Sequence, residues 1–267
     1  MSGSLEGRVA LVTGAARGQG RSHALALARE GADVVICDLA RDLPTVPYGM
    51  ASSEDLEATA AEVMKCGRRC LPAVVDVREL AAMEELVVGA RVELGAVDIV
   101  CANAGVISFG PAWELTEQQW DEVLDTNLKG AWVTCRAAVP AMVEAGRGGA
   151  IVLTTSAAGL KGYSGMAHYA AAKHGLIGLA RTLAIELAPH SIRVNCVAPG
   201  GVRTPMGTND AIHDHLASEP DAARGLTNLL PDLDLVEPED VSAAVTWLVS
   251  DAARYVTGVV LPVDAGV

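Results

Sequence analysis

The sequence is poor in aromatic and in basic residues. Phe, Trp and Tyr together make up 3% of the 267 residues, although 51% of the chain is hydrophobic. The core must therefore consist of Ala, Val and Leu, which suits close packing of helices on a sheet. Lys and Arg number 20 against 33 Asp and Glu, so the net charge is −13. This balance argues against nucleic acid or an anionic membrane as partner.

Several targeting and linker signals are missing as well. The first residues hold no apolar signal-peptide core, and no uncharged apolar run approaches the roughly 18 residues of a spanning helix. No proline-rich, serine-rich or charged linker divides the chain, so we expect a single domain over residues 1–267. The six cysteines form no C-x-x-C pair, and most lie in apolar runs. We therefore expect buried free thiols in a reducing cytoplasm.

Short apolar runs alternate with helical segments along the chain. The runs at residues 8–13, 33–38, 71–77, 97–102, 149–155, 192–198 and 256–263 are expected strands. The expected helices are at residues 21–30, 53–65, 79–94, 116–144 (broken near residues 127–130), 165–188 and from 237 onward. This alternation predicts an α/β fold, one doubly wound Rossmann domain with a seven-stranded parallel sheet flanked by helices.

A glycine-rich loop follows the first strand. Gly14, Gly18 and Gly20 form a T-G-x-x-x-G-x-G pattern, with Arg17 and Gln19 between them. Glycines let the backbone approach a pyrophosphate, and the N-terminus of the next helix offers N–H groups and the positive end of its dipole. The alternative is a tight structural turn, but strand, loop and helix together predict a nucleotide site.

Asp38 ends the second strand, about 20 residues after the glycine loop, where an acid hydrogen-bonds the adenosine ribose. Its charge would repel a 2′-phosphate, so we expect NAD rather than NADP. Arg17 is the opposing signal, because a basic residue in this loop could reach such a phosphate. We give Asp38 more weight, since a carboxylate there is repulsive as well as unhelpful.

Residues 39–52 form a connection longer than usual between a strand and a helix. The segment has two prolines. Its apolar side chains predict that it packs against another part of the protein. Its place after Asp38 puts it, starting with Leu39, beside the adenosine half of a bound dinucleotide. A plain surface insertion is an equal alternative. Ser53 is the expected N-cap of the following helix.

The ends of later strands supply further candidates for the dinucleotide. Residues after the third strand would lie near an adenine, small residues after the fourth allow a ribose to approach, and the turn after the sixth could hold a nicotinamide carboxamide. An ordinary strand-end turn is the alternative. The candidates are Asp76, Val77, Asn103, Ala104, Gly105, Pro199, Gly200, Val202 and Thr204.

Tyr169 and Lys173 lie four residues apart in an Ala-rich helical segment, which places them on one face. A free tyrosine, with a pKa of about 10, is a poor acid or base near neutrality. A nearby positive charge lowers that pKa, so Tyr169 could transfer a proton at physiological pH. Alone, the pair is usually just helix surface.

Three other positions complete the candidates. Ser156 stands at the end of the fifth strand, where side chains face a ligand. Asn127 lies in an apolar helical face and is either a satisfied structural amide or the holder of a water that relays protons. His213 and His215 could suggest a metal, but no ligand set accompanies them, and we expect a solvated loop and no metal site.

Together the motifs resemble the short-chain dehydrogenase/reductase family over essentially the whole chain. The matching positions are Thr13-Gly14-x3-Gly18-x-Gly20, Asp76, Asn103-Ala104-Gly105, Asn127, Ser156, Tyr169-x3-Lys173 and Pro199-Gly200. The resemblance implies that Ser156 hydrogen-bonds the substrate oxygen and that Tyr169 transfers the proton. It further implies that Lys173 lowers the pKa of Tyr169 and holds the nicotinamide ribose, with Asn127 positioning a water. Members of the family are commonly homotetramers, packed through the long helices and the last strand.

The 39–52 loop, the helix start after it and the segment from Arg254 are similar to the mycofactocin-associated, carveol dehydrogenase-like branch of that family. This resemblance implies NAD held so tightly that it does not exchange, with electrons passed to a separate redox carrier, mycofactocin.

Three functions fit these observations. The first is an NAD-dependent alcohol dehydrogenase or ketoreductase for apolar, cyclic secondary alcohols, whose pocket candidates are Val106, Ile107, Ala157, Ala158, Tyr163 and Met206. The second is a 3-oxoacyl-thioester reductase, against which the acidic substrate flap at residues 205–236 argues, since a carrier or coenzyme would want a basic entrance. The third is a non-catalytic NAD-binding protein, against which the complete Asn/Ser/Tyr/Lys set argues.

Overall fold

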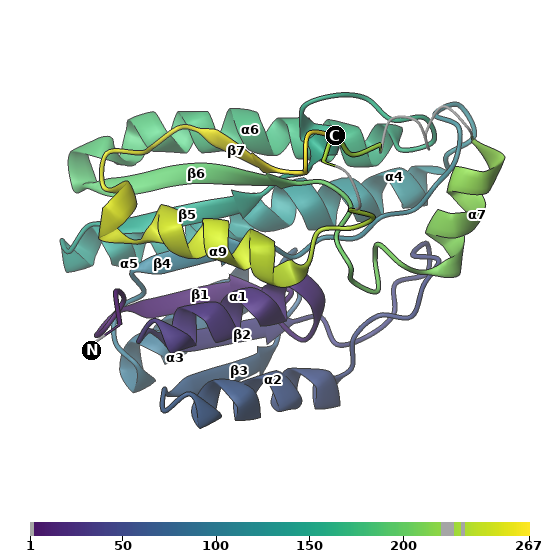
Figure 1. Ribbon diagram of the computed structural model, residues 1–267. Coiled ribbons are helices and arrows are strands. Elements are labelled where there is room, and N and C mark those ends of the chain that lie inside the picture. The colour runs from purple at the N-terminus through teal and green to yellow at the C-terminus, as the bar shows by residue number, and fades with distance from the viewer. Residues whose placement is uncertain (1–2, 220–226, 231–232) are drawn as a thin grey trace.

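The computed structural model describes residues 3–219, 227–230 and 233–267, and its centre is one parallel β-sheet (Figure 1). The seven strands lie in the order β3-β2-β1-β4-β5-β6-β7. They are β1 (Val9–Thr13), β2 (Asp33–Asp38), β3 (Cys70–Val74), β4 (Ile99–Ala102), β5 (Gly149–Thr154), β6 (Ile192–Pro199) and β7 (Val260–Val263). The order reverses between β1 and β4, so the carboxyl ends of these strands border a crevice, where open α/β sheets bind ligands. The predicted doubly wound sheet is confirmed.

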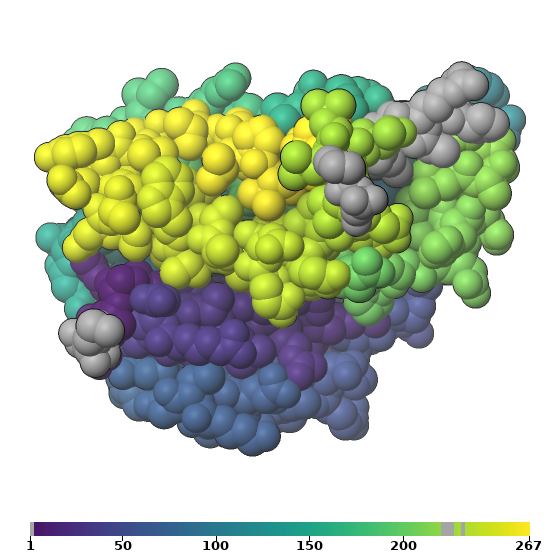
Figure 2. Space-filling view, in the orientation of Figure 1, coloured from purple at the N-terminus to yellow at the C-terminus, as the bar shows by residue number. Residues whose placement is uncertain are grey.

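Helices cover both faces of the sheet. One face carries α1 (Gly18–Arg29), α2 (Ser53–Lys65) and α9 (Pro238–Val249), which lie side by side in the space-filling view (Figure 2). The other face carries α3 (Leu80–Glu93), α5 (Gly130–Ala145) and α6 (Ala167–Leu187). The buried contacts on both faces are mainly Ala, Val and Leu, because the chain has almost no aromatic residues to place there.

The predicted strands are real, but several of their ends are different. β3 stops at Val74 because its neighbour β2 ends at Asp38, the residue paired with Val74, so the chain beyond has no strand to pair with. β7 begins only at Val260 because Gly258 turns the chain, with a φ of 76°. Pairing with the neighbouring strand thus sets the end of β3, and a glycine turn sets the start of β7.

Helix starts also differ from the predicted positions. α2 is capped by Ser52, not Ser53: the Ser52 hydroxyl accepts from Asp55 N at 3.2 Å, and the Asp55 carboxylate accepts from Ser52 N at 2.9 Å. This reciprocal capping box satisfies two helix-end donors, which makes Ser52 the better cap. α1 begins within the glycine loop itself, at Gly18.

The long helix expected at residues 116–144 is two helices joined by a special turn. α4 (Glu117–Leu124) enters a single π-helical turn, Asp125–Lys129, which leads directly into α5. Such turns widen the helix by one residue and are frequent at functional sites. The turn carries Asn127, at the position where the sequence predicted a break.

Another helix, α7 (Asp210–Ser218), lies at the edge of the molecule beyond the carboxyl ends of the strands (Figure 1). It belongs to the predicted flap at residues 205–236, of which residues 220–226 and 231–232 fall outside the described part of the chain. Within the described ranges, no helix combines the length and the apolar character needed to cross a membrane.

All six cysteines are free. Cys37, Cys101, Cys135 and Cys196 are buried, and burial raises the pKa of each thiol, that of Cys101 to about 12. These four therefore behave as small apolar side chains, as predicted. The other two, Cys66 and Cys70, are only half-buried.

Candidate active site

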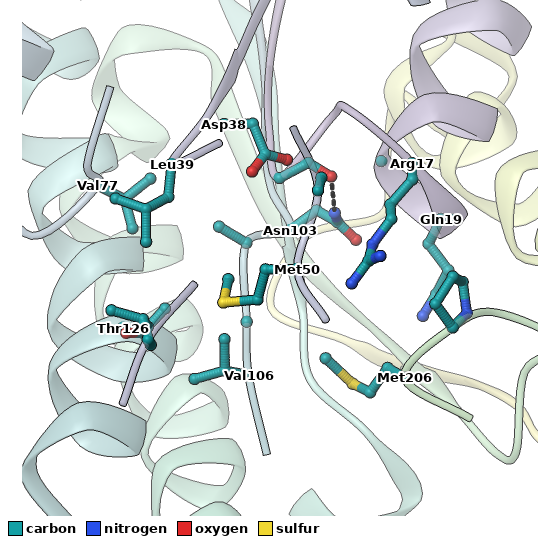
Figure 3. Close-up of a pocket in the computed structure, with 18 of the residues that line it drawn as sticks. Arg17, Gln19, Asp38, Leu39, Met50, Val77, Asn103, Val106, Thr126 and Met206 are labelled. Carbon is teal, nitrogen blue, oxygen red and sulfur yellow. Dashed lines mark hydrogen bonds between the residues drawn. The ribbon is translucent and has the colours of Figure 1, made fainter. Parts of the chain in front are cut away.

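Two adjoining cavities open at the carboxyl ends of the strands. Both are lined by Gln19, Asn103, Gly105, Thr204 and Met206, so these residues lie where the cavities meet. The first cavity extends from the glycine loop to the 39–52 loop (Figure 3). The second extends from β5 and α6 to α7. A dinucleotide in the first cavity could therefore present its reactive end to a substrate in the second.

Most of the predicted cofactor residues line the first cavity. They are Gly14, Arg17, Gly18, Gln19, Gly20, Asp38, Leu39, Asp76, Val77, Asn103, Ala104, Gly105 and Thr204. The others line the second cavity, where the nicotinamide end is expected: Tyr169, Lys173, Pro199, Gly200 and Val202. The chain brings all of them to one crevice because each follows or faces the end of a parallel strand.

The glycine loop packs too tightly for side chains. Gly14 and Gly18 have positive φ angles, and a Cβ on Gly20 would stand 2.1 Å from the Gly14 carbonyl oxygen. Asn103 joins this loop to the end of β4, since its side-chain nitrogen donates to Thr13 O at 3.0 Å and, more weakly, to Gly14 O at 3.4 Å (Figure 3). The backbone of the loop is thus fixed at the floor of the cavity.

Two polar atoms in the wall of the first cavity fit a bound dinucleotide. Gln19 Oε1 and Thr126 Oγ1 are buried and have no hydrogen-bond partner among the described residues. Both residues line this cavity. Buried polar atoms nearly always have a hydrogen-bond partner. These two atoms, which have none within the described part of the chain, therefore suit the hydroxyl and amide groups of a ligand. Thr126 was not among the sequence candidates; only the π-helical turn brings it to the cavity.

Asp38 is held at the rim of the cavity by backbone donors. Its carboxylate accepts from Ala16 N at 3.1 Å and from Ala40 N at 3.3 Å. Arg17 turns instead to the 39–52 loop, where its guanidinium donates to Gly49 O at 2.6 Å. This contact directs the Arg17 side chain to the loop, whereas Asp38 stays in the lining of the cavity.

The 39–52 loop forms one wall of the first cavity through Leu43, Tyr48 and Met50. Leu43 packs with Val106 and Val123 in a small apolar cluster that Tyr169 also contacts. The loop is therefore not a plain surface insertion.

Hydrogen bonds fix the same loop at both of its sides. Thr45 donates from its backbone N and its hydroxyl to Glu122 on α4, at 3.1 and 2.5 Å. The hydroxyl of Tyr48 accepts from Ile107 N at 3.3 Å, and Gly49 accepts from Arg17. The loop thus spans the cavity from the glycine loop to α4.

Asp76 lies in the wall of the first cavity and is paired with arginines. Burial alone would raise its pKa, but hydrogen bonds and charge from Arg78, at 2.6–3.0 Å, and charge from Arg41, at 3.6 Å, outweigh burial and lower it. Asp76 is therefore a carboxylate at neutral pH, and its charge is largely neutralised by its neighbours.

Ser156, Tyr169 and Lys173 meet in the second cavity. Ser156 follows β5 and accepts from Ala158 N at 3.1 Å, which orients its hydroxyl. Lys173 lies one turn after Tyr169 on α6, and its Nζ donates to Thr154 O at 2.7 Å and stands 5.5 Å from the centre of the Tyr169 ring. The helical spacing therefore places these groups side by side, as predicted.

The pKa values in this group differ from the expectation. Burial raises the pKa of Tyr169, and contact with the Ser156 hydroxyl offsets only part of that rise. Burial also lowers the pKa of Lys173 to about 8. The prediction that Lys173 brings the pKa of Tyr169 below its ordinary value is therefore wrong for the protein's own groups, because removal of the phenol from water outweighs any help from the ammonium.

Asn127 is a satisfied amide. Its side chain donates to Val106 O at 2.9 Å and accepts from Val106 N at 2.8 Å, so it holds the loop that follows β4. It also lies beside Lys173, since a Cβ on Gly105 would be 3.3 Å from Asn127 Oδ1 and 3.6 Å from Lys173 Nζ. The side chain therefore has the hydrogen-bond partners that a structural amide needs, and its role in holding a water stays a prediction.

The predicted substrate residues Ser156, Ala158, Tyr163, Tyr169 and Met206 all line the second cavity, as do Ile107 and Ala157. Val106 does not: it belongs to the first cavity, because Asn127 and the 39–52 loop hold it there. The sequence interpretation missed Met166, Ile212, Leu216 and Leu235. For Ile212 and Leu216, the spacing of four residues in a short helix was the available signal.

The two histidines of the flap differ from each other. His213 is exposed, but His215 is buried, with 8% of its surface accessible, and its ring stacks on Phe109 at 4.8 Å between centroids. The prediction of a solvated loop is therefore wrong for His215, because α7 turns this side chain toward the protein. Among the described residues, no three His, Cys, Asp or Glu side chains group as metal ligands would.

Comparison with known proteins finds relatives along the chain. A family model described as enoyl-(acyl carrier protein) reductase, from the short-chain dehydrogenase group, matches residues 14–267. A (-)-trans-carveol dehydrogenase of Rhodococcus erythropolis is 46% identical over 98% of this chain and 98% of its own.

Two solved structures are similar as well. One is a short-chain dehydrogenase from Mycobacterium paratuberculosis bound to NAD, 47% identical with a TM-score of 0.95. The other is a carveol dehydrogenase from Mycobacterium avium in complex with NAD, 44% identical with the same TM-score. Each alignment covers 99% of this chain and 98% of the other. Because the matches span nearly the full length on both sides, this protein belongs to the short-chain dehydrogenase/reductase family, and within it to the carveol dehydrogenase-like members.

Proposed function

We propose that this protein is an NAD-dependent alcohol dehydrogenase that interconverts an apolar, cyclic secondary alcohol and its ketone, with Tyr169 as the acid and base. One observation carries the proposal: Ser156, Tyr169 and Lys173 meet in a cavity that adjoins the dinucleotide cavity and is otherwise lined mainly by small or apolar residues. Relatives at 44–46% identity bear the name carveol dehydrogenase, and such a cavity suits an alcohol of that kind.

NAD is the cofactor. The two solved relatives hold it, and Asp38 stands at the rim where a 2′-phosphate would meet a negative charge. Gln19 Oε1 and Thr126 Oγ1 would satisfy their hydrogen bonds on it, and the glycine loop at the start of α1 would receive its pyrophosphate. When bound, NAD supplies the acceptor or donor of the hydride.

The chain's own residues supply position and protons. In oxidation, Ser156 donates a hydrogen bond to the substrate oxygen, while Tyr169 takes the hydroxyl proton as the hydride leaves the carbon. Lys173, on the same face of α6, holds the charge beside Tyr169 and would reach the nicotinamide ribose. In reduction, Tyr169 gives the proton back.

We also propose that Asn127 helps the proton to leave. Its side chain is committed to Val106, but the π-helical turn around it widens the helix beside Lys173. A water held in that turn would connect Lys173 to solvent.

Replacing the acid–base residue tests this function. Tyr169→Phe removes the hydroxyl and keeps the ring, so we expect turnover to fall by about 10²–10⁴-fold while NAD stays bound. Tyr255→Phe is the matched control, because that phenol is exposed, with 89% of its surface accessible. Oxidation of carveol should be measured alongside nucleotide content, and full activity of Tyr169→Phe would sink the mechanism.

The NAD of this enzyme is proposed to stay bound through many turnovers, with electrons leaving to an external carrier such as mycofactocin. The support is the 39–52 loop, which spans the first cavity between Arg17 and Glu122. Extended dialysis followed by denaturation and mass measurement tests it: NAD or NADH near one per chain is expected. An empty protein that binds added NAD would mean that the cofactor exchanges freely.

A 3-oxoacyl-thioester reductase is the second candidate. The description of the matching family model, enoyl-(acyl carrier protein) reductase, names a different reduction but also an acyl thioester substrate. Of the acidic flap residues that argue against it, Glu219 and Asp234 are described, whereas Asp221 and Asp232 lie outside the described residues. A single turnover of enzyme whose bound nucleotide is NADH separates the two: we expect acetoacetyl-coenzyme A to be reduced much more slowly than a cyclic ketone.

A further inference from the structure

Three consecutive residues, Ser108, Phe109 and Gly110, each contact a different segment around the second cavity. Ser108 Oγ hydrogen-bonds His168 Nε2 on α6 at 2.8 Å. The Phe109 ring stacks on His215 of α7 at an interplanar angle of 18°. Gly110 N donates to Gly165 O, in the loop before α6, at 3.0 Å. The loop after β4 thus joins the segment that carries Tyr169 to the one that carries His215.

His215 occupies the centre of this junction. Its Nε2 lies 3.0 Å from the Ser164 carbonyl oxygen, and its ring lies between Phe109 and Gly165. A Cβ on Gly165 would stand 2.2 Å from His215 Cε1. Since no real Cβ contact is that short, the ring fits only because residue 165 has no side chain. The Ser164 hydroxyl also donates a hydrogen bond, at 3.2 Å, to the carboxylate of Glu219, which follows the last residue of α7.

Two residues that line the second cavity lie beside His215 on α7. Ile212 and Leu216 are one turn before and one residue after His215 on α7, and both line the second cavity. The contacts of His215 with Ser164 and Phe109 thus hold the helix that carries both side chains at the edge of this cavity.

We propose that His215 is a specificity-determining positioning residue. Seated on Gly165 between Phe109 and Ser164, it fixes α7 so that Ile212 and Leu216 form the wall against which a bulky alcohol packs. The inference rests on the proposed function and refines it: the site selects cyclic alcohols large enough to reach α7. A small ring alcohol, held by Ser156 and Tyr169 alone, gains little from this wall.

A double-variant cycle tests the contact. Gly165→Ala introduces the clash, His215→Ala removes the ring, and the combined variant has neither. Gly146→Ala is the matched control, because Gly146 also has a positive φ, 63° against 70°, but no atom lies within 4 Å of the position that its Cβ would take. It therefore reproduces the backbone strain without the clash.

The readout is a single turnover on the purified holoenzyme, followed by the appearance of NADH absorbance at varied alcohol concentration. It needs no nucleotide exchange. For Gly165→Ala and His215→Ala, we expect the half-saturating concentration of carveol to rise about tenfold and that of cyclohexanol by less than twofold. The saturated rate should stay within about twofold, because Ser156, Tyr169 and Lys173 are untouched. The combined variant should be no worse than His215→Ala.

His215→Gln provides rescue, since its amide nitrogen can still donate to the Ser164 carbonyl; we expect a half-saturating concentration nearer to the wild type than that of His215→Ala. Equal losses for both alcohols, or additive losses in the combined variant, would overturn the proposal. If Gly165→Ala does not fold, His215→Ala and His215→Gln still allow the half-saturating concentrations of carveol and cyclohexanol to be compared.

Hydrogen exchange separates this inference from the proposed function. Amides of Asp210–Ser218 should exchange at least tenfold faster in His215→Ala than in the wild type or in Gly146→Ala. This result is expected even if neither alcohol reduces the bound nucleotide, an outcome that would refute the proposed function alone. Unchanged exchange in α7 would show that His215 does not position it, and would overturn the inference.

Discussion

Tyr169 and Lys173 share one face of α6, and burial shifts their pKa values in opposite directions, up for the phenol and down to about 8 for the amine. In the mechanism we propose, the form active in alcohol oxidation is a Tyr169 phenolate beside a Lys173 ammonium. It holds the same number of protons as a phenol beside a neutral amine. The two groups therefore lose their first proton as a pair, with one apparent pKa. Lys173 sets this value, because its pKa is the lower of the two.

A pH profile follows from this coupling. Alcohol oxidation in a single turnover should increase about tenfold per pH unit below about pH 8 and level off above it, while ketone reduction should fall above that pH. Lys173→Arg cannot lose its proton in this range, so its midpoint should move upward. A flat wild-type profile between pH 6 and 9 would contradict the coupling.

His23 affects stability rather than catalysis. It is fully buried on α1, its Nδ1 lies 2.8 Å from Ser242 Oγ on α9, and burial lowers its pKa from 6.5 to about 4. The unfolded chain binds this proton more readily than the folded one. The contribution of the neutral, buried His23 to the free energy of unfolding is therefore complete above about pH 6.5 and is lost as the pH falls toward 4.

Denaturant unfolding tests the role of His23. In His23→Asn, the loss of unfolding free energy between pH 7 and pH 4.5 should be smaller than in the wild type by roughly 2–3 kcal/mol. His174→Asn is the control, because that imidazole is exposed on α6. Equal pH dependence in wild type and His23→Asn would show that His23 does not cause the acid sensitivity.

At the scale of elements, the 39–52 loop and α4 act as a unit around the nucleotide. Glu122 receives both hydrogen bonds of Thr45, and Leu43 packs on Val123 of the same helix. Because helix and loop support each other, opening the cavity requires the loss of polar and apolar contacts together. This combination is the physical basis of the proposed tight retention of NAD.

Removing the helix side of that contact should release the nucleotide. In Glu122→Ala, we expect the half-life of bound NAD during dialysis to fall about tenfold or more, since two hydrogen bonds to a charged group are lost. Glu117→Ala removes an exposed carboxylate from the same helix and should change nothing. Identical release from wild type and Glu122→Ala would mean that this contact does not retain the cofactor.

At the scale of the whole molecule, large apolar side chains stand on the outer faces of the long helices. Trp132 on α5, Ile185 on α6 and Trp247 on α9 are 44%, 77% and 42% exposed, and Val259 beside β7 is 39% exposed. These faces suit contacts between copies of the chain.

We therefore expect a homotetramer, with a mass about four times 27.5 kDa by light scattering. Trp247→Glu should reduce it to dimers, because a charge would be buried at one of the two kinds of interface. Trp113→Glu, in an exposed loop, should leave the mass unchanged. A monomeric wild-type protein would refute the expectation.

Most of the fold was predictable because its signals are local. Buried parallel strands are continuous apolar runs, and the glycine loop, Ser156 and the Tyr169–Lys173 pair are each tied to a strand end or a helical spacing. The missed features depend on contacts between distant segments: the end of β3 on the end of β2, the capping box at Ser52, and the burial of His215 under Phe109.

The sequence by itself determined the order of strands and helices along the chain, the family and the spacing of the candidate residues Ser156, Tyr169 and Lys173, because these depend on periodicity and on residue types at set spacings. Only the tertiary structure decided the electrostatics and the shape of the site. Burial, which no spacing reveals, raised the pKa of Tyr169 and lowered that of Lys173. Packing across the chain turned residues 39–52 into a wall of the nucleotide cavity and seated His215 on Gly165.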